Sequence, residues 1–237
     1  MAGTRRDNIG VITESGSLRA PFLFLRFDTC TMNALLLIDM QLDFLPGGSL
    51  AVPGGDEIIP VVNALQDNFS LVVATQDWHP PTQKSFASNH HGKKIFEQTD
   101  LNGLPQVLWP DHCVQGSPGA ELSPAVDWKK TEAIFRKGTD PEIDSYSGFY
   151  DNGHRKATGL TAYLKGRGVT TLYLAGLAAD YCVYFTAKDA LAEGFAVFFI
   201  EDATRAISPE GYQQAKKDLL EKGGRILQSS GIKNFLP

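Results

Sequence analysis

The chain has 237 residues, of which 43% are hydrophobic and 21% are charged, the ordinary balance of a globular protein with one sizeable core. Its formal net charge of −5 provides no global basic field that would attract nucleic acid or an anionic membrane, so we expect neither as a partner and favour small-molecule chemistry. The three cysteines form no CxxC pair, which favours a reducing, cytoplasmic compartment.

Residues 1–31 differ from the rest of the chain because they carry four arginines and no lysine. Their apolar piece PFLFLRF is too short to span a bilayer, for which about 20 apolar residues are needed. We expect a dispensable extension here, followed by a single domain over residues 32–237. Organelle targeting by the extension is left open.

From residue 32 onward, short apolar runs alternate with amphipathic stretches. The apolar runs predict strands at 33–39, 71–77, 131–137, 171–176, 196–200 and 225–229. Helical spacing predicts helices at about 57–68, 158–167, 180–193 and 209–222. Gly168, Gly194 and Gly223 stand where helix C-termini need left-handed residues.

This alternation predicts right-handed crossovers and a parallel sheet covered on both faces. The predicted fold class is therefore α/β, a three-layer α/β/α sandwich around a mostly parallel six-stranded sheet. The span 78–130 shows no regular element and is rich in Pro, Gly and His. A loop of that length is usually functional or disordered.

Four reactive side chains stand at the carboxyl ends of predicted strands. Asp39, Asp77 and Lys137 end the first three strands, and Cys182 follows the fourth across the turn LAAD. Ligands bind at this edge in open α/β sheets. Each residue alone has an ordinary structural explanation, such as a turn former or a small buried hydrophobe. Together they favour a catalytic site with Cys182 as the nucleophile.

No histidine lies near this cysteine in the sequence, so its activation must come from other groups. A free thiol has a pKa of about 8.5. An N-cap at Asp180 would place Cys182 in the first turn of a helix, where the helix dipole favours the thiolate. Asp39 as the proton acceptor and Lys137 as the stabilising cation are the further candidates.

A second set of residues points to a metal ion. Asp77 and His79 are two residues apart, so both side chains point to the same side of an extended backbone. His112, in WPDHCVQG, completes a two-histidine, one-carboxylate set for a divalent transition metal. We expect zinc, with iron and manganese as alternatives. The other histidines stand in polar loops and are expected to be solvated: His90, His91 and His154.

Five segments, in order along nearly all of residues 32–229, resemble the nicotinamidases, which are isochorismatase-like cysteine hydrolases. The segments are ALLLIDMQLDFLPGGSL, TQDWHPP with SFA, GLPQVLWPDHCVQGSPGAEL, KGTDPEIDSYSGFYDN and GLAADYCVYFTAKDAL. The resemblance implies the isochorismatase-like hydrolase fold. The site residues that it implies are a catalytic triad of Asp39, Lys137 and Cys182, metal ligands Asp77, His79 and His112, and an aromatic substrate pocket of Phe44, Trp109 and Tyr146.

The resemblance also implies an oxyanion hole made by the backbone N–H groups of Ala178 and Cys182, with a cis peptide before Ala178. One divalent metal ion is implied to hold the pyridine nitrogen of the substrate. Some relatives have a further ligating side chain where this chain has Ser85, so the fourth metal contact is either Ser85 or water.

The implied activity is hydrolysis of nicotinamide to nicotinate and ammonia in NAD salvage, through a thioester on Cys182. Pyrazinamide is an expected second substrate. Three alternatives stay open: a related hydrolase that acts on isochorismate or a carbamoyl compound, a non-haem iron oxygenase, and a catalytically silent metal-binding module. A homo-oligomer is also left open.

Overall fold

The computed structural model describes residues 32–236, so the predicted extension at 1–31 lies outside the described residues. The main sheet has six parallel strands in the order β5-β2-β1-β6-β7-β8. Its strands are β1 (Met32–Ile38), β2 (Val72–Asp77), β5 (Thr131–Lys137), β6 (Val169–Leu177), β7 (Ala196–Arg205) and β8 (Arg225–Leu227). The helices are α1 (Ile59–Leu65), α2 (Leu160–Gly166), α3 (Cys182–Ala192) and α4 (Pro209–Glu221).

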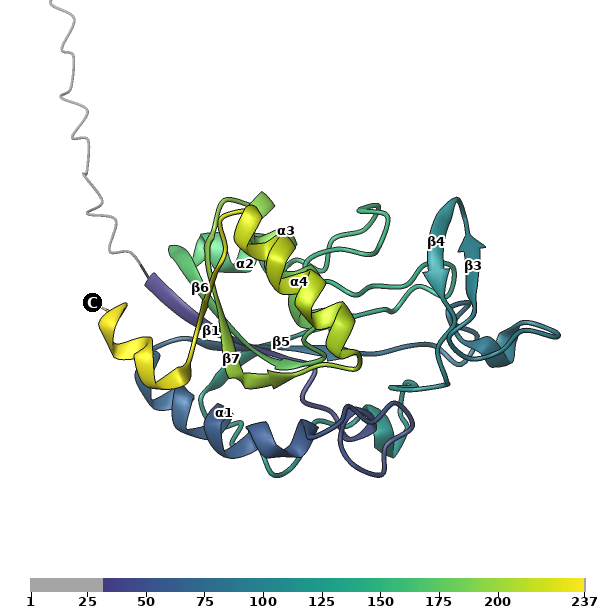
Figure 1. Ribbon diagram of the computed structural model, residues 1–237, viewed down its shortest axis with the longest axis horizontal. Coiled ribbons are helices and arrows are strands. Elements are labelled where there is room, and N and C mark those ends of the chain that lie inside the picture. The colour runs from purple at the N-terminus through teal and green to yellow at the C-terminus, as the bar shows by residue number, and fades with distance from the viewer. Residues whose placement is uncertain (1–31, 237) are drawn as a thin grey trace, which may run out of the picture. The chain divides into compact units, whose positions relative to one another are not determined.

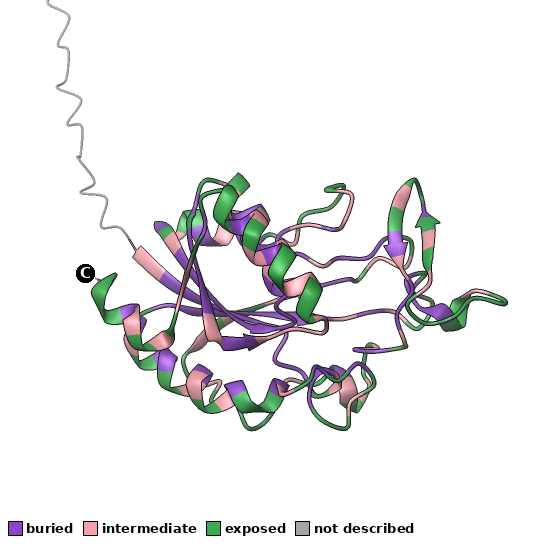
Figure 2. Ribbon diagram, in the orientation of Figure 1, coloured by how far each residue is buried: buried purple, intermediate pink, exposed green. Residues whose placement is uncertain are grey.

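Helices cover both faces of this sheet (Figure 1). The helices α2, α3 and α4 pack on one face, and α1 packs on the other together with the short C-terminal helix η6 (Ser229–Asn234). The expected three-layer α/β/α sandwich is therefore confirmed. Figure 2 shows that the buried residues concentrate in the strands and on the inward sides of the helices.

Strand β1 shows why these residues form a central strand. Leu35 and Leu37 pack toward α1, whereas Leu36 and Ile38 pack toward α2 and α3, and all four are fully buried. A strand that is apolar on both sides can be stable only when both faces of its sheet are covered. Asp39, which follows β1 directly, ends the apolar run at the carboxyl edge of the sheet.

The span 78–130 is more regular than predicted. It contains an antiparallel hairpin of β3 (Gln98–Leu101) and β4 (Leu104–Val107), joined by Asn102 and Gly103. Both turn residues have positive φ, 56° and 83°, as a two-residue hairpin turn of type I′ requires. The prediction of a wholly irregular span was wrong because an Asn-Gly pair between two short runs is a hairpin signal.

Other differences concern the ends of the elements. Strand β7 continues to Arg205, beyond the predicted end at 200, and β8 ends at Leu227. The predicted helix at 57–68 is divided into a 3₁₀ turn η2 (Gly55–Ile58), α1 and a second 3₁₀ turn η3 (Gln66–Asn68). Within residues 32–236, the structure has no helix long and apolar enough to cross a membrane.

Candidate active site

The order of the strands brings the four predicted carboxyl-end residues together. Asp77 and Lys137 end the neighbouring strands β2 and β5, and they are register partners in the sheet. Asp39 follows β1, the next strand, and Cys182 begins α3 after β6. Four adjacent strands thus contribute one reactive side chain each to a single edge of the sheet.

The Lys137 ammonium lies at the centre of this group and has no side-chain exposure. Its Nζ lies 3.0 Å from Asp39 Oδ2 and 3.1 Å from Asp77 Oδ1, and it donates a hydrogen bond of 2.8 Å to the Ser145 carbonyl oxygen. It also lies 3.5 Å from Cys182 Sγ. One cation therefore contacts the predicted nucleophile, the predicted base and a predicted metal ligand.

Burial and charge act against each other on these groups. Burial raises the pKa of Asp39, and the Lys137 ammonium offsets this only in part, so the pKa of this carboxyl stays above its ordinary value. Burial would lower the pKa of Lys137, but the carboxylates of Asp39 and Asp77 outweigh burial and hold its pKa well above the ordinary value. The ammonium is therefore charged at neutral pH, and Asp39 is a stronger base than an exposed aspartate.

Cys182 itself is 7% exposed, and burial raises the pKa of its thiol well above the ordinary value. Lys137 favours the thiolate, but the neighbouring Asp39 carboxylate opposes it. Lys137, one of the expected sources of activation, therefore does not outweigh the effect of burial on this thiol. The geometry instead fits a resting thiol whose proton has an acceptor nearby.

Thr75 is a contact that the sequence analysis missed. Its hydroxyl donates a 2.7 Å hydrogen bond to Asp39 Oδ1, and both side chains are buried. Asp39 has a φ of 48°, in the left-handed region that aspartate tolerates better than most residues. A sequence signal for Thr75 existed, because it lies two residues before Asp77 and therefore points to the same face of β2.

The three predicted metal ligands form a compact, buried set. Asp77, His79 and His112 each offer a ligand atom, and these atoms all lie within 4.8 Å of one another. His79 Nε2 lies 2.9 Å from Asp77 Oδ2, and His112 Nε2 lies 3.6 Å from the same oxygen. The Nδ1 atoms face backbone carbonyl oxygens instead, of Gly138 at 3.0 Å and of Pro110 at 2.8 Å.

These hydrogen bonds test whether the set fits a metal ion. An Nδ1 that faces a carbonyl must carry a proton, which leaves the Nε2 lone pair of each neutral imidazole directed at the carboxylate. In this form, a cation between the three electron-donating atoms would stabilise them, and backbone carbonyls that orient imidazoles are the usual support of metal ligands. The residues present therefore fit a divalent transition metal.

Two further residues bear on the metal site. A Cβ added to Gly138, whose φ is 67°, would lie 2.6 Å from His79 Nδ1 and 2.8 Å from Asp77 Oδ1. His79 and Asp77 can therefore lie this close to the backbone only if residue 138 is glycine. The Ser85 hydroxyl is fully buried and has no hydrogen-bond partner within the described residues.

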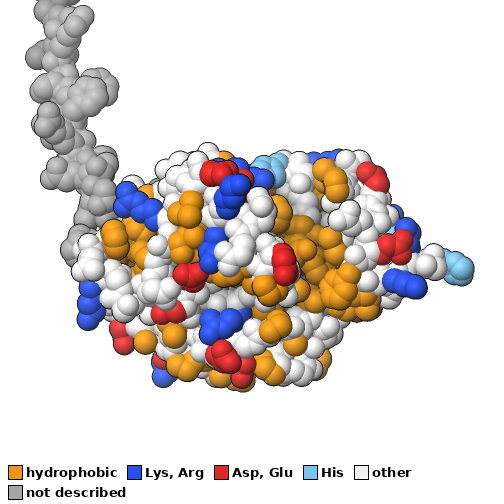
Figure 3. Space-filling view, in the orientation of Figure 1, with side chains coloured by type: hydrophobic (Ala, Val, Ile, Leu, Met, Phe, Trp, Pro, Cys, Tyr) orange, Lys and Arg blue, Asp and Glu red, His pale blue; other side chains and the backbone are white. Residues whose placement is uncertain are grey.

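A cavity opens beside these groups. The residues that line it are Phe44, Leu50, Asp77, Trp109, His112, Asp144, Tyr146, Ala178, Tyr181, Cys182 and Ile207. All three predicted pocket aromatics are therefore in its wall. The sequence analysis missed Leu50, Asp144, Tyr181 and Ile207. Figure 3 shows that apolar side chains gather on the face drawn there, between α4 and the β3–β4 hairpin.

The aromatic wall is held in place from the hairpin side. Trp109 contacts Tyr146 edge-on, with ring centroids 6.2 Å apart, and Tyr181 at 4.8 Å. The Tyr146 hydroxyl accepts hydrogen bonds from Trp109 Nε1 at 3.2 Å and from Gln106 Nε2 at 2.8 Å. Gln106 belongs to β4, so the hairpin fixes one side of the cavity.

The predicted oxyanion hole lies at the junction of β6 and α3. The peptide between Leu177 and Ala178 is cis, as the family resemblance implies. Within residues 32–236, the N–H groups of Ala178 and Cys182 donate to no protein acceptor. Both donors are therefore available to a ligand in the cavity.

The expected N-cap at Asp180 was wrong. The N-cap of α3 is Tyr181, and no side chain caps that helix. The Asp180 carboxylate instead accepts hydrogen bonds from the backbone N–H groups of Ile207 and Ser208, each at 2.9 Å. Two amide donors in the loop before α4 offer this carboxylate more hydrogen bonds than a single N-cap contact with α3 would.

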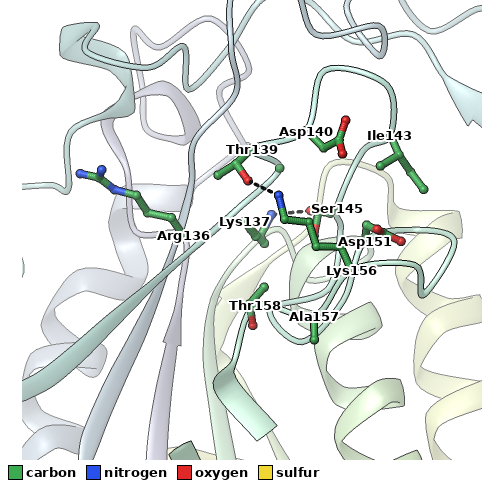
Figure 4. A pocket seen from close by; sticks show the side chains of 11 residues that line it. Arg136, Lys137, Thr139, Asp140, Ile143, Ser145, Asp151, Lys156, Ala157 and Thr158 are labelled. Atoms are coloured by element: carbon green, nitrogen blue, oxygen red, sulfur yellow. Dashed lines mark hydrogen bonds between the residues drawn. The ribbon is translucent and has the colours of Figure 1, made fainter. Parts of the chain in front are cut away.

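A second cavity lies along the loop that follows β5 (Figure 4). Lys156 reaches across it toward the Thr139 hydroxyl, at 3.5 Å, and Lys137 lies in its wall. None of the other predicted site residues lines this cavity. The cavity beside Cys182 is therefore the candidate active site.

The structure is an α/β/α sandwich with a buried cysteine and a possible metal-binding set at the carboxyl edge of its sheet. Residues 33–230 match the isochorismatase domain, and the chain belongs to the isochorismatase family. It is 46% identical over 211 residues to the nicotinamidase of Acinetobacter baylyi, an alignment that covers 89% of this chain and 99% of that protein.

Two solved structures are similar to it as well. The nicotinamidase/pyrazinamidase of Acinetobacter baumanii has a TM-score of 0.83 and 45% identity, over 85% of this chain and 98% of that one. The pyrazinamidase of Pyrococcus horikoshii in complex with zinc has a TM-score of 0.70 and 40% identity, over 83% and 99%.

Proposed function

We propose that this protein hydrolyses nicotinamide to nicotinate and ammonia, and pyrazinamide in the same way, as a step of NAD salvage. The observation that carries the proposal is the contact of one buried ammonium, Lys137, with both Asp39 and Cys182 beside an aromatic cavity. The similarity to nicotinamidases over most of the chain supports the same substrate class.

Substrate binding is assigned to the aromatic wall and the metal set. Phe44, Trp109 and Tyr146 would enclose the flat ring and hold the carboxamide against Cys182 Sγ. Asp77, His79 and His112 would hold one divalent ion, with zinc preferred, which when bound would supply Lewis-acid coordination for the pyridine nitrogen.

The acylation half of the reaction needs a base, a nucleophile and an oxyanion hole. Asp39 takes the proton of the Cys182 thiol, and the sulfur forms a bond to the amide carbon. The N–H groups of Ala178 and Cys182 stabilise the oxygen that becomes negative, and one such donor contributes about 3 kcal/mol. Asp39 then gives its proton to the nitrogen, the C–N bond breaks, and ammonia leaves a thioester on the sulfur.

Deacylation uses the same groups. Asp39 accepts a proton from water as the water oxygen attacks the thioester carbon, and the oxyanion hole stabilises the second tetrahedral species. The C–S bond then breaks, nicotinate leaves, and the sulfur recovers its proton. Throughout, Lys137 remains an ammonium and keeps the two buried aspartates compensated.

Ammonia release from nicotinamide tests the proposal, with Cys182→Ala as the inactive variant and Cys113→Ala as its matched control. Cys113 is also buried, but it does not line the cavity. We expect ammonia from the wild type and the control, none from Cys182→Ala, and a trapped acyl adduct on Cys182 by mass spectrometry. A Cys182→Ala variant with substantial turnover would remove this residue from the mechanism.

Residues 1–31 are proposed to be dispensable for this activity, because every predicted site residue lies after Met32. A chain that begins at Met32 should keep the wild-type rate and melting temperature. A large fall in either value would mean that the segment packs on the hydrolase.

A further inference from the structure

Asp180 lies two residues before the predicted nucleophile, yet the proposed reaction does not use it. Its side chain is buried, with 7% of the residue exposed. Its Oδ1 accepts the N–H of Ile207 and its Oδ2 accepts the N–H of Ser208, both at 2.9 Å. The carboxylate thus forms a two-point clamp on the loop between β7 and α4.

The clamped loop is a wall of the active-site cavity. Ile207 lines that cavity together with Cys182, Ala178 and Tyr181. Ser208 is the N-cap of α4, where its hydroxyl accepts the N–H of Gly211 at 3.1 Å. The carboxylate of Asp180 therefore also lies at the positive end of the 13-residue helix α4.

Few other contacts hold this loop to the segment that carries the nucleophile. The last backbone hydrogen bond of β7 to this segment is donated by the N–H of Ala179 to the Arg205 carbonyl oxygen, at 2.7 Å. Beyond Arg205, the described hydrogen bonds between residues 206–208 and the nucleophile segment are the two that Asp180 accepts. Ile207 is partly buried and packs against the core on one side, so the two hydrogen bonds to Asp180 add to an incomplete packing contact.

We propose that Asp180 is a positioning residue that, by clamping residues 207 and 208, holds Ile207 against the ring of the substrate and sets which ring-substituted pyridine and pyrazine carboxamides enter the cavity. This inference rests on the proposed function of the site. Asp180 touches no reacting atom, so its effect should appear in KM and selectivity and leave kcat nearly unchanged.

The first experiment compares nicotinamide with 5-methylnicotinamide in the wild type, Asp180→Ala and Asp180→Asn. An apolar pocket discriminates one methyl group by about tenfold or more. We expect Asp180→Ala to raise KM for nicotinamide about tenfold, to keep kcat within about threefold, and to lose most of the discrimination against the methylated ring. Asp180→Asn keeps one acceptor oxygen, so its KM and its selectivity should lie between those of the wild type and Asp180→Ala. If the alanine variant does not fold, the asparagine variant is used for the test.

Asp202 provides a matched control. It is also an aspartate of the β7 region that clamps a loop, because its carboxylate accepts the N–H and the hydroxyl of Ser229 at 2.7 and 2.6 Å. It lines no part of the cavity. Asp202→Ala should lower the melting temperature about as much as Asp180→Ala does, and it should leave KM and selectivity unchanged.

A double-mutant cycle tests the route through Ile207. If Asp180 acts by placing that side chain, Ile207→Ala alone removes the discrimination against the methylated ring, and adding Asp180→Ala changes KM and selectivity little further. In the cycle that pairs Ile207→Ala with Asp202→Ala, the effects of the two substitutions should add. Additive effects of Asp180→Ala and Ile207→Ala, or a lower melting temperature with unchanged KM and selectivity, overturn the inference.

Nicotinate binding, followed by tryptophan fluorescence, separates this inference from the proposed function. A wild type that releases no ammonia from nicotinamide contradicts the function alone. The dissociation constant of nicotinate should still rise about tenfold in Asp180→Ala and not in Asp202→Ala. Equal dissociation constants in the wild type and both Asp180 variants contradict the inference.

Discussion

Replacement of Lys137 by methionine removes the cation on which the buried charges of the site depend. Nζ lies 3.0 Å from one Asp39 oxygen and 3.1 Å from one Asp77 oxygen, with no side-chain exposure. At an effective dielectric constant of 20, each pair attracts by about 5 kcal/mol, and the desolvation of the charges offsets much of that. Loss of one partner from a buried ion pair typically costs about 3–5 kcal/mol, because the other charge stays uncompensated.

We therefore expect Lys137→Met to lower the free energy of unfolding by about 3–5 kcal/mol. In a domain of this size, about 2–4 °C of melting temperature corresponds to 1 kcal/mol, which predicts a fall of about 6–20 °C. Nicotinamide hydrolysis should be lost as well, since the pKa of Asp39 would rise further without the ammonium.

The pH dependence of this difference has a definite sign. In the wild type, burial raises the pKa of Asp77, but His79 and Lys137 outweigh burial and hold the pKa well below its ordinary value. This contribution to stability is present above about pH 4 and is lost as the pH falls through the lowered pKa. In Lys137→Met, the pKa of Asp39 should rise further and the pKa of Asp77 should rise from its lowered value. Protonation then relieves the uncompensated charge as the pH falls from 7 toward 5, so the stability gap between the variant and the wild type narrows.

Urea unfolding of chelator-treated protein at pH 5 and pH 7 measures both effects. Lys130→Met is the control, because Lys130 forms an ion pair with Asp67 at 2.6 Å, but both side chains are largely exposed, at 47% and 79%. Such a surface pair contributes about 0–1 kcal/mol. A loss below about 1 kcal/mol in Lys137→Met, or a gap that widens toward pH 5, would refute the assignment of Lys137 as the compensating cation.

Asp39→Asn removes a carboxylate that raises the pKa of the Cys182 thiol. Iodoacetamide should therefore alkylate Cys182 faster at pH 7 in this variant, while amide hydrolysis is lost. An unchanged alkylation rate would contradict this reasoning. Burial would lower the pKa of His79, but the Asp77 carboxylate outweighs burial and raises it. Zinc must displace that proton, so zinc affinity measured by calorimetry should fall about tenfold per pH unit below the raised pKa, and a flat profile from pH 8 to 6 would argue against this site. Gly138→Ala should lose zinc because its Cβ would collide with His79, whereas Gly168→Ala, with a similar φ of 73° and nothing within 4 Å, should retain it.

Local features of the chain were readable from the sequence because they depend on near neighbours. Gly168, Gly194 and Gly223 end helices with φ of 73°, 90° and 89°, as the positions of these glycines predicted. The apolar run before Asp39 predicted a strand buried on both faces, and the structure has one there. The prediction that polar strand ends share one edge followed from parallel strands, and it is confirmed for Asp77 and Lys137 by their register.

Other features required the tertiary structure. The order β5-β2-β1-β6 decides that Lys137 touches Asp39 and Asp77 at once, so that the predicted catalytic and metal sets share a cation. The role of Asp180 was likewise decided by tertiary structure. Its carboxylate accepts hydrogen bonds from two amides of the loop before α4, which lie 27 and 28 residues away in sequence, instead of capping α3.

The physical reason is that hydrogen bonds and ion pairs act over a few ångströms, whereas the pattern of one segment reports only its own faces. A strand's periodicity shows which side chains are buried and where the strand ends. Which strand lies beside it, and so which charge faces which, depends on the packing of segments far apart in the chain. Lys137 and Asp180 look alike in sequence as polar residues at element ends, and only the elements that packed beside them made one a shared cation and the other a clamp.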